Sequence, residues 1–422
     1  MTRSLRAGFG STEITPPLGI DLCGYGSYLD RRAKAVLDPL YARSLVLDDG
    51  ATRLAIVSCD LIGFTVPYSN DVRRRVARAC RTSAERVMLA CTHTHSGPNT
   101  GGLIGMGAVD DDYMAHLPEP LVEACRRAVA DLAPAEIGWA VGAVEPIGFC
   151  RLSKPPDDYE DPLLGVLLCR REKGNVGLVQ YACHAVTLGV NVELSADYPG
   201  GVVRRMREYG IEALFLNGPS GDIDPLVNKA KWGSGTPADV ERYGCHLGDR
   251  ALELSRSISC SSSISLSARE TRPALPVRTP SLDEVRRALA AARERCAQAG
   301  EPGDRFEVAW GEKALDMLES GAPHALDFVV QVVRIGALKL VGLSGEIYSS
   351  VGRLATRAAG DPALGVAQAN GDTGYMPDEA ALAAHEDYGS HGAAKIYGHF
   401  PLDPQAPRLI AAAVAAMSRG TV

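Results

Sequence analysis

His93 and His95 lie two residues apart in the segment CTHTHSGP, which follows an apolar run at residues 87–91. The apolar run is typical of a short buried strand, and the Gly-Pro pair ends it. If the backbone stays extended from Thr92 to His95, both imidazoles lie on one face, because strand side chains alternate. Such a pair can hold a metal ion, or one imidazole can bind the ion while the other transfers protons.

Further groups able to bind a metal or transfer protons follow apolar runs elsewhere in the chain. His184 ends the run YACH, a position that by itself favours a core histidine bonded to backbone over a ligand. Asp222 and Asp224 lie in a loop rich in Gly and Pro, which either aims a carboxylate at a site or forms an Asx turn. Glu346 follows a strand-like run, where the first turn of a helix is the alternative, and Tyr375 lies in a glycine-rich loop. Two imidazoles, a carboxylate and another oxygen donor form a ligand set for zinc.

The elements that must position these groups alternate between apolar runs and helical patterns. Residues 54–59, about 69–80 and 87–91 predict a strand, a helix and a strand, which is a βαβ unit. Residues 163–169 and 177–183 flank a Lys-Gly-Asn turn and predict a hairpin. We therefore predict an α/β fold with a mixed, mostly parallel sheet core flanked by helices.

Residues 281–321 predict a helical insertion in that fold. Ser281 and Glu284 have the spacing of a capping box, and two stretches of helical periodicity follow. The chain contains no internal repeat and no low-complexity tail. We therefore expect residues 1–422 to form a single domain that carries this insertion.

The composition is that of a globular protein: 422 residues, 46% hydrophobic and 23% charged. A net charge of −7 argues against nucleic acid as a partner, and without a run of about 18 apolar residues no membrane span is expected. The eleven cysteines are odd in number, and no signal-type apolar core opens the chain. These features favour a reducing compartment, the cytoplasm, and a small molecule as the partner. The sequence makes no prediction of oligomeric state.

Several segments together resemble the catalytic domain of the neutral/alkaline (non-lysosomal) ceramidase family, over most of residues 7–400. The segments are AGFGSTEITPP at 7–17, DPLYARSLVL at 38–47, THTHSGP at 92–98 and SADYPG at 195–200. The histidine-containing segment is the most specific of the four. The resemblance implies the fold of that catalytic domain and one bound zinc ion.

The resemblance also implies roles for individual residues. It assigns four zinc ligands: His93, His184, Glu346 and Tyr375. His95 is similar to a histidine that lies beside the metal-bound water. Arg151 is similar to an arginine that contacts the substrate, and Tyr388 is the nearest candidate for a second active-site tyrosine, one residue out of register.

Three features depart from the family. The segment GDIDP at residues 221–225 has Asp224 where ceramidases carry a serine. A carboxylate is neither a serine-type nucleophile nor a neutral hydrogen-bond donor at pH 7. The chain ends shortly after the catalytic region, without a C-terminal immunoglobulin-like domain, and lacks a recognisable secretion signal. These departures argue against ceramide as the substrate and leave the metal chemistry in place.

The function expected from the sequence is zinc-dependent hydrolysis of an amide (N-acyl) bond, or a related ester or lactone bond, in a small molecule, by a metal-activated water. Asp224 would accept a proton or grip an ammonium or hydroxyl group of the substrate. His95 would protonate the leaving nitrogen or stabilise the oxyanion, and Arg151 would orient the substrate. Three alternatives stay open: a lyase or isomerase acting next to a carbonyl, a dinuclear hydrolase with Asp224 as a ligand of a second metal beside His95, and a non-catalytic metal-dependent scaffold.

Overall fold

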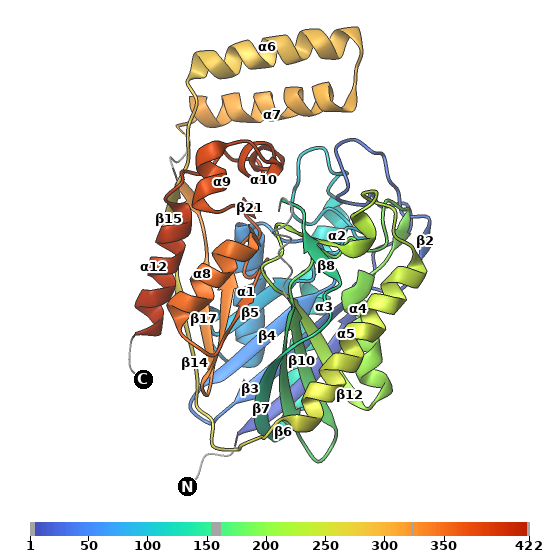
Figure 1. The fold of residues 1–422 in the computed structure, drawn as a ribbon, viewed down its shortest axis with the longest axis vertical. Coiled ribbons are helices and arrows are strands. Elements are labelled where there is room, and N and C mark those ends of the chain that lie inside the picture. The colour runs from blue at the N-terminus through green and yellow to red at the C-terminus, as the bar shows by residue number, and fades with distance from the viewer. Residues whose placement is uncertain (1–4, 153–161, 322–324, 420–422) are drawn as a thin grey trace.

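Three main β-sheets flanked by helices make up the chain (Figure 1). The structure is a computed structural model that describes residues 5–152, 162–321 and 325–419. The first sheet runs in the order β5 (Val87–Cys91), β4 (Arg53–Cys59), β3 (Tyr41–Asp48), β1 (Arg6–Glu13), β6 (Ala133–Pro134). The second runs β12 (Ile211–Asn217), β10 (Asn175–Tyr181), β9 (Leu163–Arg170), β7 (Glu136–Ala143). The third runs β14 (Leu266–Thr271), β17 (Val330–Ile335), β18 (Leu338–Leu343), β20 (Ala363–Val366).

Short two-stranded ribbons form separately from these sheets. They are β2 (Ala35–Val36) with β11 (Glu193–Leu194), β8 (Gly148–Cys150) with β13 (Ile223–Pro225), β15 (Ala274–Pro276) with β16 (Ala325–Asp327), and β19 (Glu346–Ile347) with β21 (Tyr375–Met376). Two of the ribbons, β8–β13 and β19–β21, contain or adjoin residues that the sequence singled out for chemistry.

The prediction of a mostly parallel core is wrong, although the mixed α/β class is confirmed. In the main sheets only β4–β5, β10–β12 and β18–β20 are parallel among the described residues, and the other pairs are antiparallel. The reason is the length of the connections. Residues 171–174 join β9 to β10, and residues 336–337 join β17 to β18. Such short links form hairpins, because a parallel crossover needs a dozen residues or more.

Helices cover the outer face of each sheet. The α-helices are α1 (Val66–Cys80), α2 (Asp111–His116), α3 (Pro118–Ala130), α4 (Asp197–Glu208), α5 (Pro237–Ser257), α6 (Leu282–Gln298), α7 (Pro302–Glu319), α8 (Ser349–Ala359), α9 (Glu379–Ala384), α10 (Tyr388–His391), α11 (Ala393–Ile396) and α12 (Ala406–Ser418). Two 3₁₀ turns, η1 (Ala84–Arg86) and η2 (Leu226–Asn228), complete the set. Helices α1 and α3 pack on the first sheet, α4 and α5 on the second, and α8 and α12 on the third.

The inner faces of the three sheets share one apolar core. Strand β4 shows how the sequence builds it, because its side chains alternate between two clusters. Leu54 and Ile56 face the core between the sheets, while Ala55 and Val57 face the cluster under α1 and α3. Both faces of the strand are therefore buried, which explains why its sequence is a continuous apolar run.

The residues predicted as a helical insertion form a hairpin of α6 and α7, which stands at the top of Figure 1; the strands before and after it, β15 and β16, pair with each other. The capping box that opens it is confirmed. The backbone N–H of Ser281 donates to Glu284 at 2.8 Å, and the backbone N–H of Glu284 donates to the Ser281 hydroxyl at 3.3 Å. Helix α7 is the nearer of the two to the body of the protein.

None of the helices in the described parts of the chain combines the length and the apolarity that crossing a membrane requires.

All eleven cysteines lie in the described parts of the chain, none of them forms a disulfide, and eight are buried. Burial raises the pKa of the Cys23 thiol to about 12, which removes the reactive thiolate at neutral pH. We expect a thiol reagent such as Ellman's reagent to modify at most three cysteines of the native protein: Cys245, Cys260 and Cys296. All eleven should react after unfolding in guanidinium. Rapid modification of four or more in the native state would contradict the burial described here.

Candidate metal centre

Three imidazoles converge where strands of two sheets end. His93 and His95 follow β5, and His184 follows β10. One ring nitrogen from each lies within 4.8 Å of the others, a spacing that can hold a metal ion. His93 and His184 are buried, and their ring centroids are 5.0 Å apart. The structure therefore brings together the histidine pair of the sequence motif and a histidine 91 positions further along the chain.

The backbone from His93 to His95 is not extended, so the condition under which the two imidazoles would share a strand face is not met. Strand β5 ends at Cys91, and His93 has φ of 66°, in the left-handed region. This conformation is unfavourable for a residue with a side chain, and it recurs at functional sites. The backbone N–H of His93 donates to the Leu61 carbonyl at 2.9 Å, which ties the turn to the segment after β4. The turn still places the Nε2 atoms of His93 and His95 3.3 Å apart.

Backbone carbonyls fix which ring nitrogen of two histidines carries the proton. Nδ1 of His93 lies 2.6 Å from the Ile62 carbonyl, and Nδ1 of His184 lies 2.7 Å from the Ser220 carbonyl. A carbonyl only accepts, so each Nδ1 must donate. When these rings are neutral, each Nε2 therefore presents its lone pair to the centre of the site, as a metal ligand does.

Both of these Nε2 atoms face the same carboxylate oxygen. Oε2 of Glu346 lies 3.2 Å from Nε2 of His93 and 2.9 Å from Nε2 of His184. Burial raises the pKa of Glu346, but the charge that His93 and His184 carry when protonated lowers it more, so this pKa lies well below its usual range. Lone pairs that face a carboxylate repel it unless a cation lies between them or the rings are protonated. The arrangement therefore calls for positive charge at this point.

An arginine links the tyrosine and the aspartate that the sequence singled out. Arg151 donates from one terminal nitrogen to the Tyr375 hydroxyl at 3.0 Å and to the Gly221 carbonyl at 2.7 Å. Its other terminal nitrogen lies 3.2 Å from Oδ1 of Asp224. The Tyr375 hydroxyl is in turn 3.4 Å from Nε2 of His184. Burial raises the pKa of Tyr375 well above its usual range, although Arg151 opposes the shift.

Of the two candidate aspartates, only Asp224 lines the cavity beside the histidines. Asp222 faces α8 instead: its carboxylate accepts from the Ser349 backbone N–H at 2.6 Å and from the Ser349 hydroxyl at 2.8 Å. Strand β13 pairs with β8, which sets Asp224 opposite Phe149 and close to Arg151. Asp222 precedes β13, so the strand alternation that would place residues 222 and 224 on one face does not extend to it.

Several donor atoms lie as close together as ligands of one metal ion do. For zinc, bonds of about 2.0–2.1 Å place tetrahedral ligand atoms about 3.3 Å apart. Glu346 lies 3.2 Å from His93 and 2.9 Å from His184, and Tyr375 lies 3.4 Å from His184. Imidazole nitrogen and carboxylate oxygen are also donor types that zinc accepts. His93, His184 and Glu346 form the innermost group. His95 lies next to His93, and Tyr375 lies next to His184.

A cavity of about 570 Å³ opens beside this group. His95, His184, Glu346 and Tyr375 line it together with Arg151 and Asp224, and most other lining residues are apolar or aromatic. Tyr388 also lines the cavity and is 49% exposed. Its ring centroid is 5.5 Å from that of Tyr375. The eight residues that were given roles as zinc ligands, acid–base groups or substrate contacts, His93 among them, therefore lie in or around one site, whereas Asp222 does not line it.

Sequence reasoning missed two residues of the site. The Tyr397 hydroxyl donates to Oε1 of Glu346, and Tyr397 lines the cavity. Oδ2 of Asp372 lies 3.9 Å from Nδ1 of His93, and burial together with Glu346 raises the pKa of Asp372 to about 7. Asp372 lies in the glycine-rich loop before Tyr375, so a carboxylate at this position could have been selected from the sequence as a candidate site residue. Tyr397 follows a short helix, and nothing in its sequence neighbourhood marks it.

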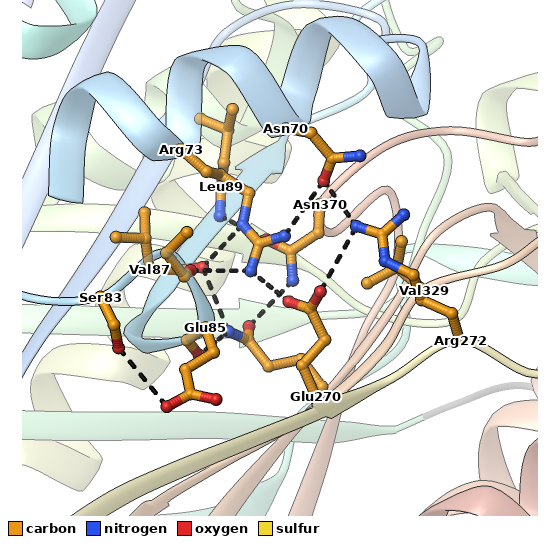
Figure 2. Close-up of polar contacts among 12 residues, drawn as sticks. Asn70, Arg73, Ser83, Glu85, Val87, Leu89, Glu270, Arg272, Val329 and Asn370 are labelled. Atoms are coloured by element: carbon orange, nitrogen blue, oxygen red, sulfur yellow. Dashed lines mark hydrogen bonds and ion pairs between the residues drawn. The ribbon is translucent and has the colours of Figure 1, made fainter.

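A buried polar network ties the loop before Tyr375 to the strand before His93 (Figure 2). The backbone N–H of Asn370 donates to the Leu89 carbonyl at 2.6 Å, and the Leu89 N–H donates to Oδ1 of Asn370 at 3.0 Å. The Asn370 side chain also donates to Gln331 at 3.0 Å. Its φ of 62° suits asparagine better than most residues. Asn370 thus acts as a bridge between two segments of the site.

If the site binds a metal, we expect Asn370→Ala to weaken that binding by about 10–100-fold, the usual effect of removing a supporting residue of a metal site. It should also cost about 1–3 kcal/mol of unfolding free energy for each buried partner left unpaired. Zinc titration and urea unfolding measure the two effects. Asn70→Ala is the matched control, since Asn70 accepts from Arg272 at the exposed end of the same network. Unchanged zinc affinity in Asn370→Ala would show that the bridge does not position the site.

The chain is similar to known proteins in both sequence and structure. Over 266 residues the chain is 29% identical to neutral ceramidase of Pseudomonas aeruginosa, a match covering 56% of this chain and 39% of that protein. Over 228 residues it is 27% identical to neutral ceramidase of Mycobacterium tuberculosis, covering 46% and 34% respectively. The matches thus span little more than a third of the relatives' own length. No family model matches the chain.

The structural similarity extends over nearly the whole chain. The crystal structure of neutral ceramidase from Pseudomonas aeruginosa superposes with a TM-score of 0.75 at 19% identity, covering 98% of this chain and 74% of that one. A ceramidase complexed with C2 gives a TM-score of 0.76 at 18% identity, covering 98% and 75%. The protein therefore has a ceramidase-like mixed α/β fold. By sequence and structure together it is a distant relative of neutral ceramidase, which confirms the relationship that the motifs indicated.

Proposed function

We propose that the protein is a zinc-dependent hydrolase that cleaves an amide (N-acyl) bond, or a related ester or lactone bond, in a small molecule. The observation that carries the proposal is the convergence of two imidazole Nε2 atoms on Oε2 of Glu346 beside a cavity of about 570 Å³. The distant relationship to neutral ceramidase supports it. The mostly apolar lining favours a substrate with an apolar group.

Four side chains would hold the ion: His93, His184, Glu346 and Tyr375. When bound, zinc would polarise the substrate carbonyl and lower the pKa of a water molecule. The Tyr397 hydroxyl holds the other oxygen of the Glu346 carboxylate, which fixes the orientation of that ligand.

We assign acid–base roles or positioning roles to the remaining residues of the site. Oδ1 of Asp224 is engaged by Arg151, which leaves Oδ2 to accept the proton from the attacking water. His95 lines the cavity beside His93, in reach of the leaving nitrogen or the oxyanion. Both terminal nitrogens of Arg151 contact protein groups: Asp224, the Tyr375 hydroxyl and a backbone carbonyl. We therefore assign Arg151 to positioning these groups. We assign Tyr388 to substrate contact at the exposed side of the cavity.

The Arg151–Asp224 pair also bears on the dinuclear alternative. A second metal ion bound by Asp224 would lie close to a guanidinium that is 3.2 Å from the same carboxylate. Two cations at one carboxylate repel each other strongly in a buried site. The geometry therefore favours one zinc ion.

The test is metal analysis of the purified protein followed by a panel of N-acyl, ester and lactone compounds. We expect about one zinc per chain, and turnover that a chelator abolishes and added zinc restores. In oxygen-18 water the acid product should gain one solvent oxygen. Turnover without solvent oxygen would identify a lyase or isomerase instead, and bound zinc without any turnover would indicate a scaffold.

A further inference from the structure

One wall of the cavity is an apolar cluster contributed by separate loops. Ile62, Leu103, Met106 and Ile396 all line the cavity, all are at most 7% exposed, and they belong to one hydrophobic cluster. Phe306 of α7 packs against this cluster without being a lining residue itself. A helix of the insertion therefore backs a wall of the proposed active site.

Two backbone hydrogen bonds join the loops that form this wall. The Ile104 N–H donates to the Ile396 carbonyl at 2.9 Å, and the Tyr28 N–H donates to the Gly105 carbonyl at 2.7 Å. A side chain at Gly105 would meet the Tyr28 ring at 3.0 Å, so the two loops are in close contact. The loops around residues 28, 105 and 396 thus meet at one place, next to the cavity.

The first half of α7 is attached to these same loops. The Arg305 guanidinium lies over the Tyr28 ring, 4.2 Å from its centroid. Glu307 accepts from the ammonium group of Lys395 at 2.7 and 2.9 Å. Phe306 lies between these two residues in sequence, so one helical turn holds both loops and packs on the wall between them. Figure 1 shows α7 as the helix of the hairpin that faces the body.

The wall is uncharged. Its four lining side chains are aliphatic or thioether groups, and Arg151, the sole cationic residue lining the cavity among those the structure describes, is paired with Asp224. A ligand group that lies against this wall gains by burying apolar surface and has no charged partner there.

We propose that this wall binds an apolar group of the substrate and that α7, through Phe306, sets the length of the group that fits. The inference rests on the proposed function, because it concerns the substrate of that same site. Phe306 is then a positioning residue: it acts through Leu103, Met106 and Ile396 and determines specificity without touching the reacting atoms.

The test is binding of a series of straight-chain alkyl hydroxamates, from two to twelve carbons, to the zinc-loaded full-length protein. Each methylene that becomes buried should tighten binding about fourfold, until the wall stops further gain. In Phe306→Ala the affinity should keep rising for one or two further methylenes. The longest hydroxamates should therefore bind this variant about 4–16-fold more tightly than they bind the wild type. In Phe306→Trp the affinity should stop rising at a shorter chain length than in the wild type.

Leu315→Ala is the matched control, because Leu315 lies in the same helix but packs in a different cluster, with Trp310 and Phe400. It removes a comparable apolar side chain and should leave the chain-length profile unchanged. A profile of Phe306→Ala that coincides with that of the wild type, in protein shown by circular dichroism to be folded, overturns the inference. Equal shifts in Phe306→Ala and Leu315→Ala also overturn it.

Hydrolysis of N-acyl compounds with the same chain lengths separates this inference from the proposed function. If hydroxamate binding shifts as expected but no amide, ester or lactone is turned over, the proposed function fails and the role of α7 stands. If substrates are turned over with the same chain-length preference in every variant, the role of α7 fails and the proposed function stands.

Discussion

Replacing His184 by alanine is expected to remove zinc binding and hydrolysis together. The variant loses one of the two Nε2 atoms that face Glu346, in a ring whose orientation the Ser220 carbonyl fixes. Removing a residue that only supports a ligand lowers metal affinity or activity by about 10–100-fold. Removing a ligand itself should therefore lower both by more than about 100-fold. Competition against a chromophoric chelator measures zinc affinity, and kcat/KM on the best compound of the panel measures activity.

His246→Ala controls for removal of a histidine as such. His246 lies on α5, and its Nε2 is 2.9 Å from the Glu145 carbonyl, outside the site. It should keep wild-type zinc content and turnover. If His184→Ala retained one zinc per chain and turnover within tenfold of the wild type, the metal centre would have to lie elsewhere.

Asp224→Asn is expected to lower kcat by about 10²–10⁴-fold while the protein keeps one zinc per chain. General base catalysis contributes an effect of that size, and an amide cannot take the proton. Asparagine has nearly the same shape and keeps an oxygen for Arg151, so the geometry around Tyr375 should survive. Single-turnover kinetics and zinc analysis of the same preparation provide the measurement.

Asp222→Asn is the matched control in the same loop, since Asp222 holds Ser349 at the start of α8 and does not line the cavity. It should lower stability and leave kcat within a few-fold of the wild type. Two zinc ions in the wild type and one in Asp224→Asn would establish the dinuclear alternative. Unchanged kcat in Asp224→Asn would remove the proton-accepting role from Asp224.

Local sequence patterns predicted much of the fold because they act over short distances. The run at β4 and β5, the turn between β9 and β10, and the capping box at Ser281 each depend on neighbours within a few residues. Strand direction depends on the length of the connection for neighbouring strands such as β9 and β10, and on which distant strands pair for the others. The pattern of apolar residues in a buried strand is the same for parallel and antiparallel partners, and the prediction of a mostly parallel core therefore failed.

By itself the sequence determined which residue types were available for chemistry, their positions after apolar runs, and the relationship to ceramidases. The tertiary structure decided how they meet: His93 turns through a left-handed conformation, Asp224 rather than Asp222 reaches the cavity, and Tyr397 binds Glu346. Each of these depends on contacts between segments far apart in the chain. A single sequence carries no record of such contacts, because packing and hydrogen bonding across the folded core select among backbone conformations that are locally similar in energy.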